Sequence, residues 1–348
     1  HCYESARARS PDELDTHEAK LAVKKLAEAG VAYIAFSGGE PLMHPDLFEI
    51  IHEVKRNEMA FSLATNATLA TARISKHLKD LDCAFVQVSL DGAIAETHDA
   101  FRGTKCFDRT VEGIRNLVAA GIQVGVATTV TKQNLAEVPL IIDKAEELGA
   151  ILFMNYNFIP TGRGAAMKQK DLSPTEREQL LAWMAREIGK RKLNLLSTAC
   201  QYSRICADAG RLNLTHFDTF GQYPDLAKSA QFLADFVGGC GTSRLYCALE
   251  PNGDIEPCVF IPIVLGNILH GDFIDIWHNH PVLETIRRRE NFKGYCRVCE
   301  HRNICGGCRA RAYGYFGDLT ESDPGCILNQ KAWESIAQQQ IKQTQVSA

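Results

Sequence analysis

Cysteine is the residue type that most restricts what this chain can fold into. Eight of its 13 cysteines lie in the last third of the chain: Cys240, Cys247, Cys258, Cys296, Cys299, Cys305, Cys308 and Cys326. Four of these follow the pattern Cys-x-x-Cys-x5-Cys-x-x-Cys, with Gly306 and Gly307 where the backbone must turn tightly. Eight soft thiolates suit two four-thiolate sites. Each site would hold either an iron–sulfur cluster or a zinc ion, and the spacing alone leaves both open.

The rest of the composition narrows the class of protein. Disulfide frameworks are typical of small secreted domains. Residues 1–20 are polar and charged, without an apolar leader, so we expect a reduced, cytoplasmic protein. The net charge of −4 gives no general attraction to nucleic acid or to a membrane, and no apolar run is long enough to span one. Cys83 is predicted to be a core residue, while Cys106, Cys200 and Cys206 show no ligand pattern.

The region from about residue 14 to 157 alternates between helical and extended patterns. Apolar residues at helical spacing predict helices at 17–29, 45–57, 71–80, 108–120 and 135–148. Short apolar runs between them predict strands at 31–36, 60–65, 84–90, 122–130 and 151–157. Helices between strands favour right-handed crossovers and a parallel sheet. The expected fold class is therefore α/β: a partial (β/α)6 barrel of the TIM type, followed by a cysteine-rich domain. Its site should lie at the carboxyl ends of the strands.

Shifts in composition suggest where the domains end. Ser173, Pro174 and Glu176 form a helix-start signature that opens a helix over 173–190. Beyond it the periodic signal weakens, and from residue 238 glycine and cysteine become frequent. We expect a barrel domain over 1–195, a connector over 196–237, a cysteine-rich domain over 238–330 and a C-terminal helix or tail over 331–348.

Short motifs near the predicted strand ends resemble those of radical S-adenosylmethionine enzymes. Ser37-Gly38-Gly39-Glu40-Pro41 is similar to the GGE motif of that family. Cys2, between His1 and Tyr3, resembles the last cysteine of the C-x-x-x-C-x-x-C motif, whose other two cysteines would precede residue 1. Asn66, Ser89 and Asp91 match the next two strand ends, and Arg102 resembles an arginine that meets the methionine carboxylate.

This resemblance implies a cofactor and roles for these residues. S-adenosylmethionine would bind a 4Fe-4S cluster held in part by Cys2, with Glu40 receiving its amino group and Arg102 its carboxylate. Cys2, Glu40 and Arg102 would then be the catalytic set. Further cofactor contacts are expected from the remaining motif residues: Tyr3, Gly38, Gly39, Asn66, Ser89 and Asp91.

The cysteine-rich region resembles the SPASM extension, a domain with two auxiliary clusters. Cys240, the string Gly253-x4-Cys258, the group beginning at Cys296, and Cys326 follow its order, although Cys305-x-x-Cys308 is one residue shorter than usual. The resemblance implies three 4Fe-4S clusters in all and makes zinc the lesser alternative. By the interleaved family pattern, the ligands would be Cys240, Cys247, Cys258 and Cys308 for one auxiliary cluster, and Cys296, Cys299, Cys305 and Cys326 for the other.

Three strings, at residues 157–164, 244–247 and 306–313, are most similar to the haem-pathway members of this group. They imply an iron tetrapyrrole substrate, shortened at its side chains by decarboxylation or acetate loss, and an electron donor such as flavodoxin or ferredoxin. Arg163, Arg309 and Arg311 are candidate partners for substrate carboxylates, with a structural role as the alternative. His44 and His216 are candidate iron ligands, although a lone histidine is more often a hydrogen-bonded core or loop residue.

Two other functions stay open. The first is a maturase from the same superfamily, which would introduce a crosslink, thioether or epimer into a ribosomal peptide. The second is not an enzyme: an iron–sulfur electron carrier or a zinc-ribbon module on a degenerate barrel. Glu40, Asn66, Ser89 and Arg102 argue against the second function, because a scaffold has no need of a set of methionine-binding residues.

Overall fold

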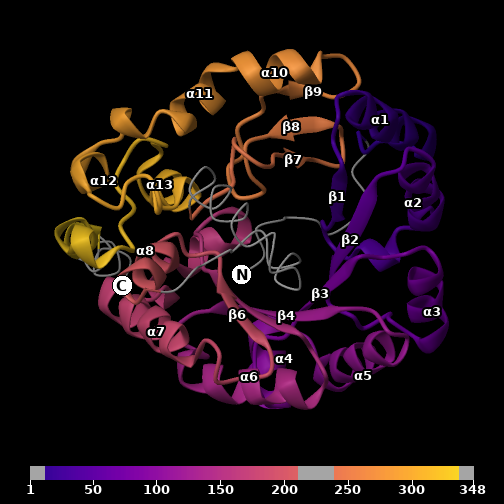
Figure 1. Cartoon of the computed structure of the whole chain (residues 1–348), viewed down its shortest axis with the longest axis horizontal. Coiled ribbons are helices and arrows are strands. Elements are labelled where there is room, and N and C mark those ends of the chain that lie inside the picture. Colours follow the sequence, from indigo (N-terminus) through magenta and orange to yellow (C-terminus); the bar gives the residue numbers. More distant parts are fainter. Residues whose placement is uncertain (1–11, 211–238, 337–348) are drawn as a thin grey trace, which may run out of the picture.

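A computed structural model describes residues 12–210 and 239–336 of the chain (Figure 1). Its first part is one sheet of six parallel strands in the order β1-β2-β3-β4-β5-β6. The strands are β1 (Tyr33–Phe36), β2 (Ala60–Thr65), β3 (Phe85–Ser89), β4 (Val124–Val130), β5 (Leu152–Asn157) and β6 (Asn194–Ser197). The helices around the sheet are α1 (Thr16–Glu28), α2 (Leu47–Arg56), α3 (Ala72–Asp80), α4 (Ala95–Arg102), α5 (Phe107–Ala119), α6 (Val138–Glu147), α7 (Pro174–Glu187) and α8 (Gln201–Asp208).

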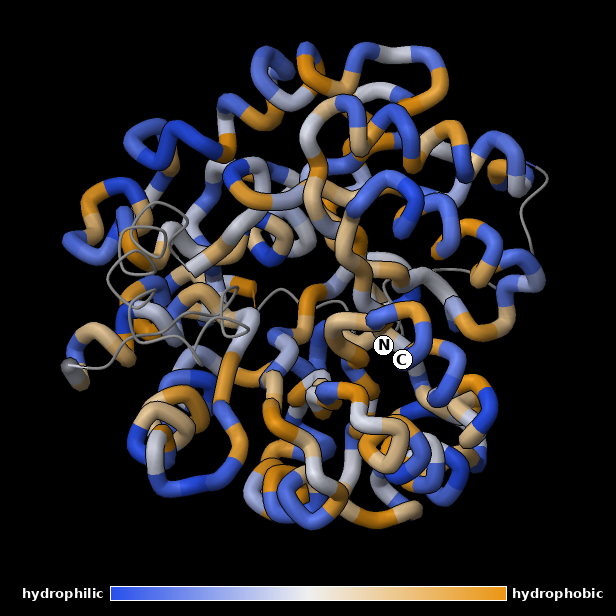
Figure 2. The backbone as a smooth tube through the Cα atoms, turned by 45° about the vertical axis from the view of Figure 1, so that its right-hand side comes forward, coloured by the Kyte–Doolittle hydropathy of each residue, from blue (hydrophilic) through white to orange (hydrophobic). Residues whose placement is uncertain are grey.

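The predicted α/β fold class and parallel sheet are confirmed. All five strand ranges read from the sequence coincide with β1 to β5 within a few residues. The sixth strand, β6, had no predicted range of its own, and the short helix α4 was missed. The apolar interior explains the agreement, because Val86, Val126 and Phe153 are fully buried on neighbouring strands. Hydrophobic and hydrophilic residues alternate along the helices that cover the sheet (Figure 2).

Local sequence signals fix where two of the helices begin. Asp15 accepts a hydrogen bond from the backbone N–H of Glu18, whose carboxylate accepts from the N–H of Asp15, so α1 starts with a complete capping box. Ser173 and Glu176 form the same reciprocal pair at the start of α7, with Pro174 in its first turn, as the sequence predicts. Among the described residues, no helix combines the length and apolar character that crossing a membrane requires.

The cysteine-rich part contains a small antiparallel sheet and several short helices. The sheet has the order β7-β8-β9, formed by β7 (Ala248–Leu249), β8 (Asp254–Glu256) and β9 (Gly266–Asn267). The helices that follow are α10 (Phe273–Asn279), α11 (Pro281–Arg287), α12 (Gly294–Val298) and α13 (Arg309–Phe316). Most of the expected connector and of the expected tail lies outside the described residues.

Within the described residues, the parallel sheet is open between β1 and β6, and the cysteine-rich part spans this opening (Figure 1). At one side, Leu26 of α1 packs with Ile255 and Leu283, and Lys25 Nζ donates to the carbonyl of Leu269 at 2.6 Å. At the other side, Gln201 Nε2 of α8 donates to Asp323 Oδ2 at 2.7 Å. The second domain thus completes the ring and lies beside the carboxyl ends of β5 and β6.

Candidate active site and cluster sites

Glu40 lies four residues after the end of β1, and its carboxylate is anchored at the carboxyl edge of the sheet. Oε1 accepts from the Thr65 hydroxyl at 2.6 Å and from the Leu42 N–H at 3.1 Å, and Oε2 accepts from the Asn66 N–H at 2.7 Å. Gly38 precedes it with a φ of +113°, a conformation that favours glycine. The structure therefore brings the predicted residues Glu40 and Asn66 together, with Thr65 as a partner that the sequence analysis did not name.

The surroundings of Glu40 make it a site for a cation. Burial raises the pKa of its carboxyl, while hydrogen bonds from Thr65, Asn66 and Leu42 and the charge of Arg102 lower it in part. A half-buried carboxylate that these donors do not fully compensate gains from an added positive charge. The amino group of an amino-acid ligand would supply that charge.

Arg102, at the end of α4, lies near Glu40 and forms an ion pair with Asp91, which follows β3. The Nε–Oδ2 distance is 2.7 Å, and the Asp91 side chain is 1% exposed whereas that of Arg102 is 20% exposed. Asp91 also accepts from the Thr129 N–H, and its own N–H donates to Nδ1 of the buried His98. Asp91 therefore holds the arginine in place. His98, four residues before Arg102 on the same helix, was not anticipated.

The structure also describes the predicted residues Ser89 and His44. Ser89 ends β3 and is half-buried at the same sheet edge. His44 Nδ1 accepts from the Asp46 N–H, and its Nε2 lies 3.8 Å from Glu13, so this histidine has partners in the protein itself. Cys2, Tyr3 and His216 lie outside the described residues.

One group of cysteines surrounds a cavity in the second domain. Cys296, Cys299, Cys305 and Cys326 line it together, beside Arg204 and Asn329. Nitrogen donors approach the sulfurs: Asn329 Nδ2 lies 3.7 Å from Cys296 Sγ, and the Gly307 N–H lies 3.4 Å from Cys305 Sγ. Such donors are characteristic of thiolate clusters, whose sulfurs they stabilise. These four residues are the set expected for one auxiliary cluster.

The other group differs from the expected set. Cys258 and Cys308 are buried in one apolar cluster with Cys240 packed against them, and Cys200, which follows β6, is buried in the same cluster. The predicted fourth member, Cys247, packs elsewhere, against the apolar residues around Ile255 and Leu265. Burial raises the pKa of the Cys258 thiol to about 12 and that of Cys247 to about 11.

The two arginines of α13 are buried, with partners inside the protein. Arg309 is 2% exposed, donates to the carbonyls of Leu319 and Glu321 at 2.9 and 2.7 Å, and lies over the Phe292 ring. Arg311 is fully buried. By contrast, Arg163 is exposed in the turn after β5. Of the three predicted substrate arginines, Arg163 is therefore the one whose side chain faces solvent.

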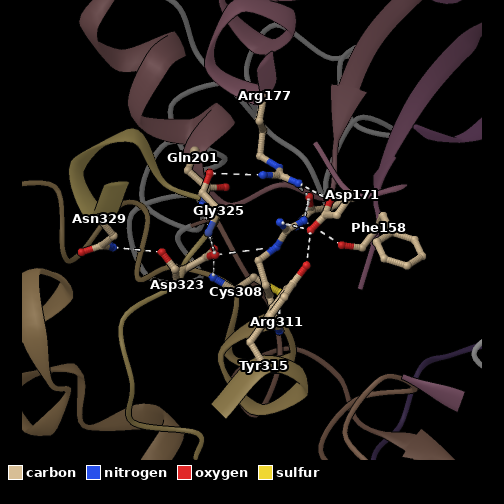
Figure 3. A network of polar contacts seen from close by, with 12 residues as sticks. Phe158, Asp171, Arg177, Gln201, Cys308, Arg311, Tyr315, Asp323, Gly325 and Asn329 are labelled. Carbon is tan, nitrogen blue, oxygen red and sulfur yellow. Dashed lines mark hydrogen bonds and ion pairs between the residues drawn. The ribbon is translucent and has the colours of Figure 1, made fainter. Parts of the chain in front are cut away.

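Arg311 belongs to a buried network between the two domains (Figure 3). Its Nη1 lies 2.9 Å from Asp171 Oδ2, and Arg177 Nη2 of α7 lies 2.7 Å from Asp171 Oδ1. Asp323 accepts from the backbone N–H of Cys308 at 2.9 Å and from Gln201, and lies 3.7 Å from Arg311 Nε. Two arginines and two aspartates balance in charge, which buried ions require.

Comparison with known proteins agrees with this geometry. Residues 1–145 match the Radical SAM superfamily, and residues 240–300 match the SPASM family, described as an iron–sulfur cluster-binding domain. An AdoMet-dependent heme synthase of Methanosarcina barkeri is 36% identical over 94% of this chain and 91% of the relative. The mycofactocin maturase MftC of Mycobacterium tuberculosis is 30% identical over 94% of this chain and 78% of the relative.

Solved structures support the same fold. Streptococcus suis SuiB bound to its precursor peptide SuiA matches 92% of this chain and 71% of its own, with a TM-score of 0.70 and 18% sequence identity. The structure has the barrel, the anchored Glu40 at its edge and a second domain with two groups of cysteines. The 36% identity to the heme synthase, over nearly the whole of both chains, agrees with these features. The chain belongs to the radical SAM superfamily of enzymes, in the group that carries a C-terminal SPASM domain.

Proposed function

We propose that this enzyme shortens the carboxylate side chains of an iron tetrapyrrole in haem biosynthesis. The observation that carries the proposal is the 36% identity, over nearly the whole of both chains, to a protein named AdoMet-dependent heme synthase. The site fits the cofactor in that name, because Glu40 offers an anchored carboxylate to an ammonium group and Arg102 a guanidinium to a carboxylate.

Three four-iron clusters would serve this reaction: one at the barrel edge, held in part by Cys2, and two in the SPASM domain. When bound, the first cluster and S-adenosylmethionine supply a 5′-deoxyadenosyl radical, and the auxiliary clusters offer an acceptor for the electron left after a carboxylate leaves as carbon dioxide. A small electron-transfer protein such as flavodoxin or ferredoxin would deliver the reducing electron, in the cytoplasm.

The residues of this chain bind and orient the reactants. Glu40 would hold the methionine ammonium, kept in place by Thr65 and the Asn66 N–H. Arg102 would hold the methionine carboxylate, in an orientation that Asp91 fixes. Arg163 is proposed to meet a substrate carboxylate, because it is exposed beside the carboxyl end of β5. Arg309 and Arg311 are assigned instead to holding the SPASM domain together and against the barrel.

The first prediction concerns the substrate. Anaerobic incubation of the reduced, full-length protein with S-adenosylmethionine and an iron coproporphyrin is expected to lower the product mass by carboxylate- or acetate-sized units. 5′-Deoxyadenosine should form in step, and the Soret band should shift when the tetrapyrrole binds. Mass spectrometry and absorption spectra measure these changes, with the metal-free porphyrin as a control for the iron requirement.

The peptide-maturase alternative needs a test of its own, because the maturase MftC is 30% identical to this chain. The same assay provides that test. A short peptide encoded near the gene is supplied in place of the tetrapyrrole. If the peptide gains a crosslink, thioether or epimer while no tetrapyrrole binds or changes mass, the haem proposal is wrong and this alternative replaces it.

The second prediction concerns metal content. The full-length protein, produced anaerobically with its native N-terminus, should contain about 12 iron and about 12 sulfide ions, which corresponds to three four-iron clusters. Iron and sulfide analysis with Mössbauer spectroscopy measures both. Stoichiometric zinc without sulfide would contradict the cluster assignment and favour two structural zinc sites.

A further inference from the structure

We propose that Cys200 is the fourth ligand of the auxiliary site formed by Cys240, Cys258 and Cys308, and that Cys247 is not a ligand. This inference rests on the proposed cluster content but not on the proposed substrate. It places one ligand of the SPASM site in the barrel part of the chain, between β6 and α8 and 40 residues before the next ligand along the sequence.

The position of Cys200 results from how the two domains meet. It occupies the position just before α8 without a side-chain capping hydrogen bond, and the residue is 1% exposed. Gly239 packs directly on it: a Cβ added to that glycine would lie 2.7 Å from the Cys200 carbonyl oxygen and 3.1 Å from its Cα. Since such contacts are shorter than side chains tolerate, only glycine fits before Cys240. The chain therefore delivers Cys240 directly against Cys200.

The thiols themselves converge. The Cys200 thiol lies close to the thiols of both Cys240 and Cys308, in the same packed cluster. Cys258 lies close enough to Cys240 and Cys308 for their charges to affect it. All four belong to one packed cluster in the interior. Four thiols that converge from separate segments of the chain are the donor set of a tetra-thiolate centre.

The Cys247 side chain points away from these four thiols, toward the small antiparallel sheet. Tyr246, its neighbour, directs its hydroxyl to within 3.5 Å of Cys258 Sγ, and the Thr242 hydroxyl donates to the same oxygen at 2.9 Å. Successive side chains of an extended segment point in opposite directions. Cys247 accordingly packs with the apolar residues of the small sheet, including Ile255 and Leu265.

The hydrogen-bonding environment supports a cluster at this site. The Arg311 N–H lies 3.4 Å from Cys308 Sγ, and the Cys308 N–H is held by Asp323 at 2.9 Å. The buried Arg289 guanidinium lies near Cys200, Cys240 and Cys305. Donors and a positive charge beside the sulfurs offset the negative charge of a thiolate-bound centre.

The test compares single cysteine variants of the full-length, anaerobically produced protein. Cys200→Ala and the positive control Cys258→Ala should each lose one cluster, about four iron ions per chain, or convert it to a three-iron form visible by EPR. Cys247→Ala should keep the full iron content. The matched control is Cys206→Ala, a buried cysteine six residues further along the same segment that packs in the barrel core.

A conservative variant guards against misfolding of Cys200→Ala. Cys200→Ser keeps an oxygen ligand, so it should retain iron but change the EPR or Mössbauer signature of one cluster, with an unchanged circular dichroism spectrum. Cluster loss in Cys247→Ala with a full iron content in Cys200→Ala would overturn the inference, as would an unchanged spectrum in Cys200→Ser. If the wild type holds zinc without sulfide, the proposed cluster content fails. The zinc count of the same variants then still decides which cysteine is the ligand.

Discussion

Replacing Arg311 by methionine is expected to lower the midpoint of thermal unfolding by roughly 4–7 °C, which corresponds to about 3–5 kcal/mol for a chain of this size. The Arg311 side chain is fully buried and pairs with Asp171, itself 0% exposed, at 2.9 Å. Methionine preserves much of the volume but leaves this carboxylate with Arg177 as its remaining cationic partner. A buried charge that loses a partner cannot recover its hydration, so the cost far exceeds that of an exposed pair.

Circular dichroism under anaerobic conditions measures the shift, and Arg115→Met provides a matched control. Arg115 has a side chain that is 58% exposed and forms a 3.7 Å pair with Glu112 on the surface of α5, so its removal should cost less than about 1 kcal/mol. Asp171→Asn should be about as harmful as Arg311→Met, because Arg177, Arg311 and the Tyr315 hydroxyl all use that carboxylate. Equal shifts for Arg311→Met and Arg115→Met would show that the network does not hold the domains.

Glu40→Gln is expected to weaken the binding of S-adenosylmethionine by about 2–4 kcal/mol, or roughly 30- to 1,000-fold in Kd, and to stop formation of 5′-deoxyadenosine. The variant loses the negative charge that would face the ligand ammonium. Its amide also offers one acceptor in place of the two oxygens that now accept from Thr65, Leu42 and Asn66.

Equilibrium binding and product analysis by chromatography distinguish this role from a structural one. The iron content should stay at the wild-type value, because Glu40 is not a thiolate ligand. Glu49→Gln, which changes a carboxylate that is 57% exposed on α2, should bind and react like the wild type. Wild-type turnover in Glu40→Gln would remove Glu40 from the catalytic set.

The sequence allowed the barrel strands to be predicted because each is a short apolar run with a helix after it, a pattern contained within a few residues. The strand β6 was missed because only its two central residues, Leu195 and Leu196, are apolar. Glu40 and Asn66 could be found because each lies within four residues of the end of its strand. In both cases the informative residues are neighbours along the chain.

The parts that were not predicted depend on residues far apart in the sequence. Cys200 shows no local pairing, and its three partners lie 40 to 108 residues further along the chain. The string at 306–313 predicts that Arg311 is a candidate substrate contact. Its actual partner, Asp171, is 140 residues away in the sequence. The spacing of residues along the sequence indicates which of them lie in the same turn. It does not indicate which distant segments the fold brings together.

The way in which the second domain closes the barrel has a consequence for synthesis. Lys25 contacts Leu269, 244 residues later in the chain. At about 5–20 residues per second, the ribosome needs roughly 12–50 s to make that partner. During this interval the α1 residues Ala22 and Leu26 lack the second-domain residues that pack on them, and transiently exposed apolar surface promotes aggregation. The nascent barrel must therefore be protected until its own C-terminal region arrives, and the high sequence separation of these contacts should make closure a late and slow step of folding.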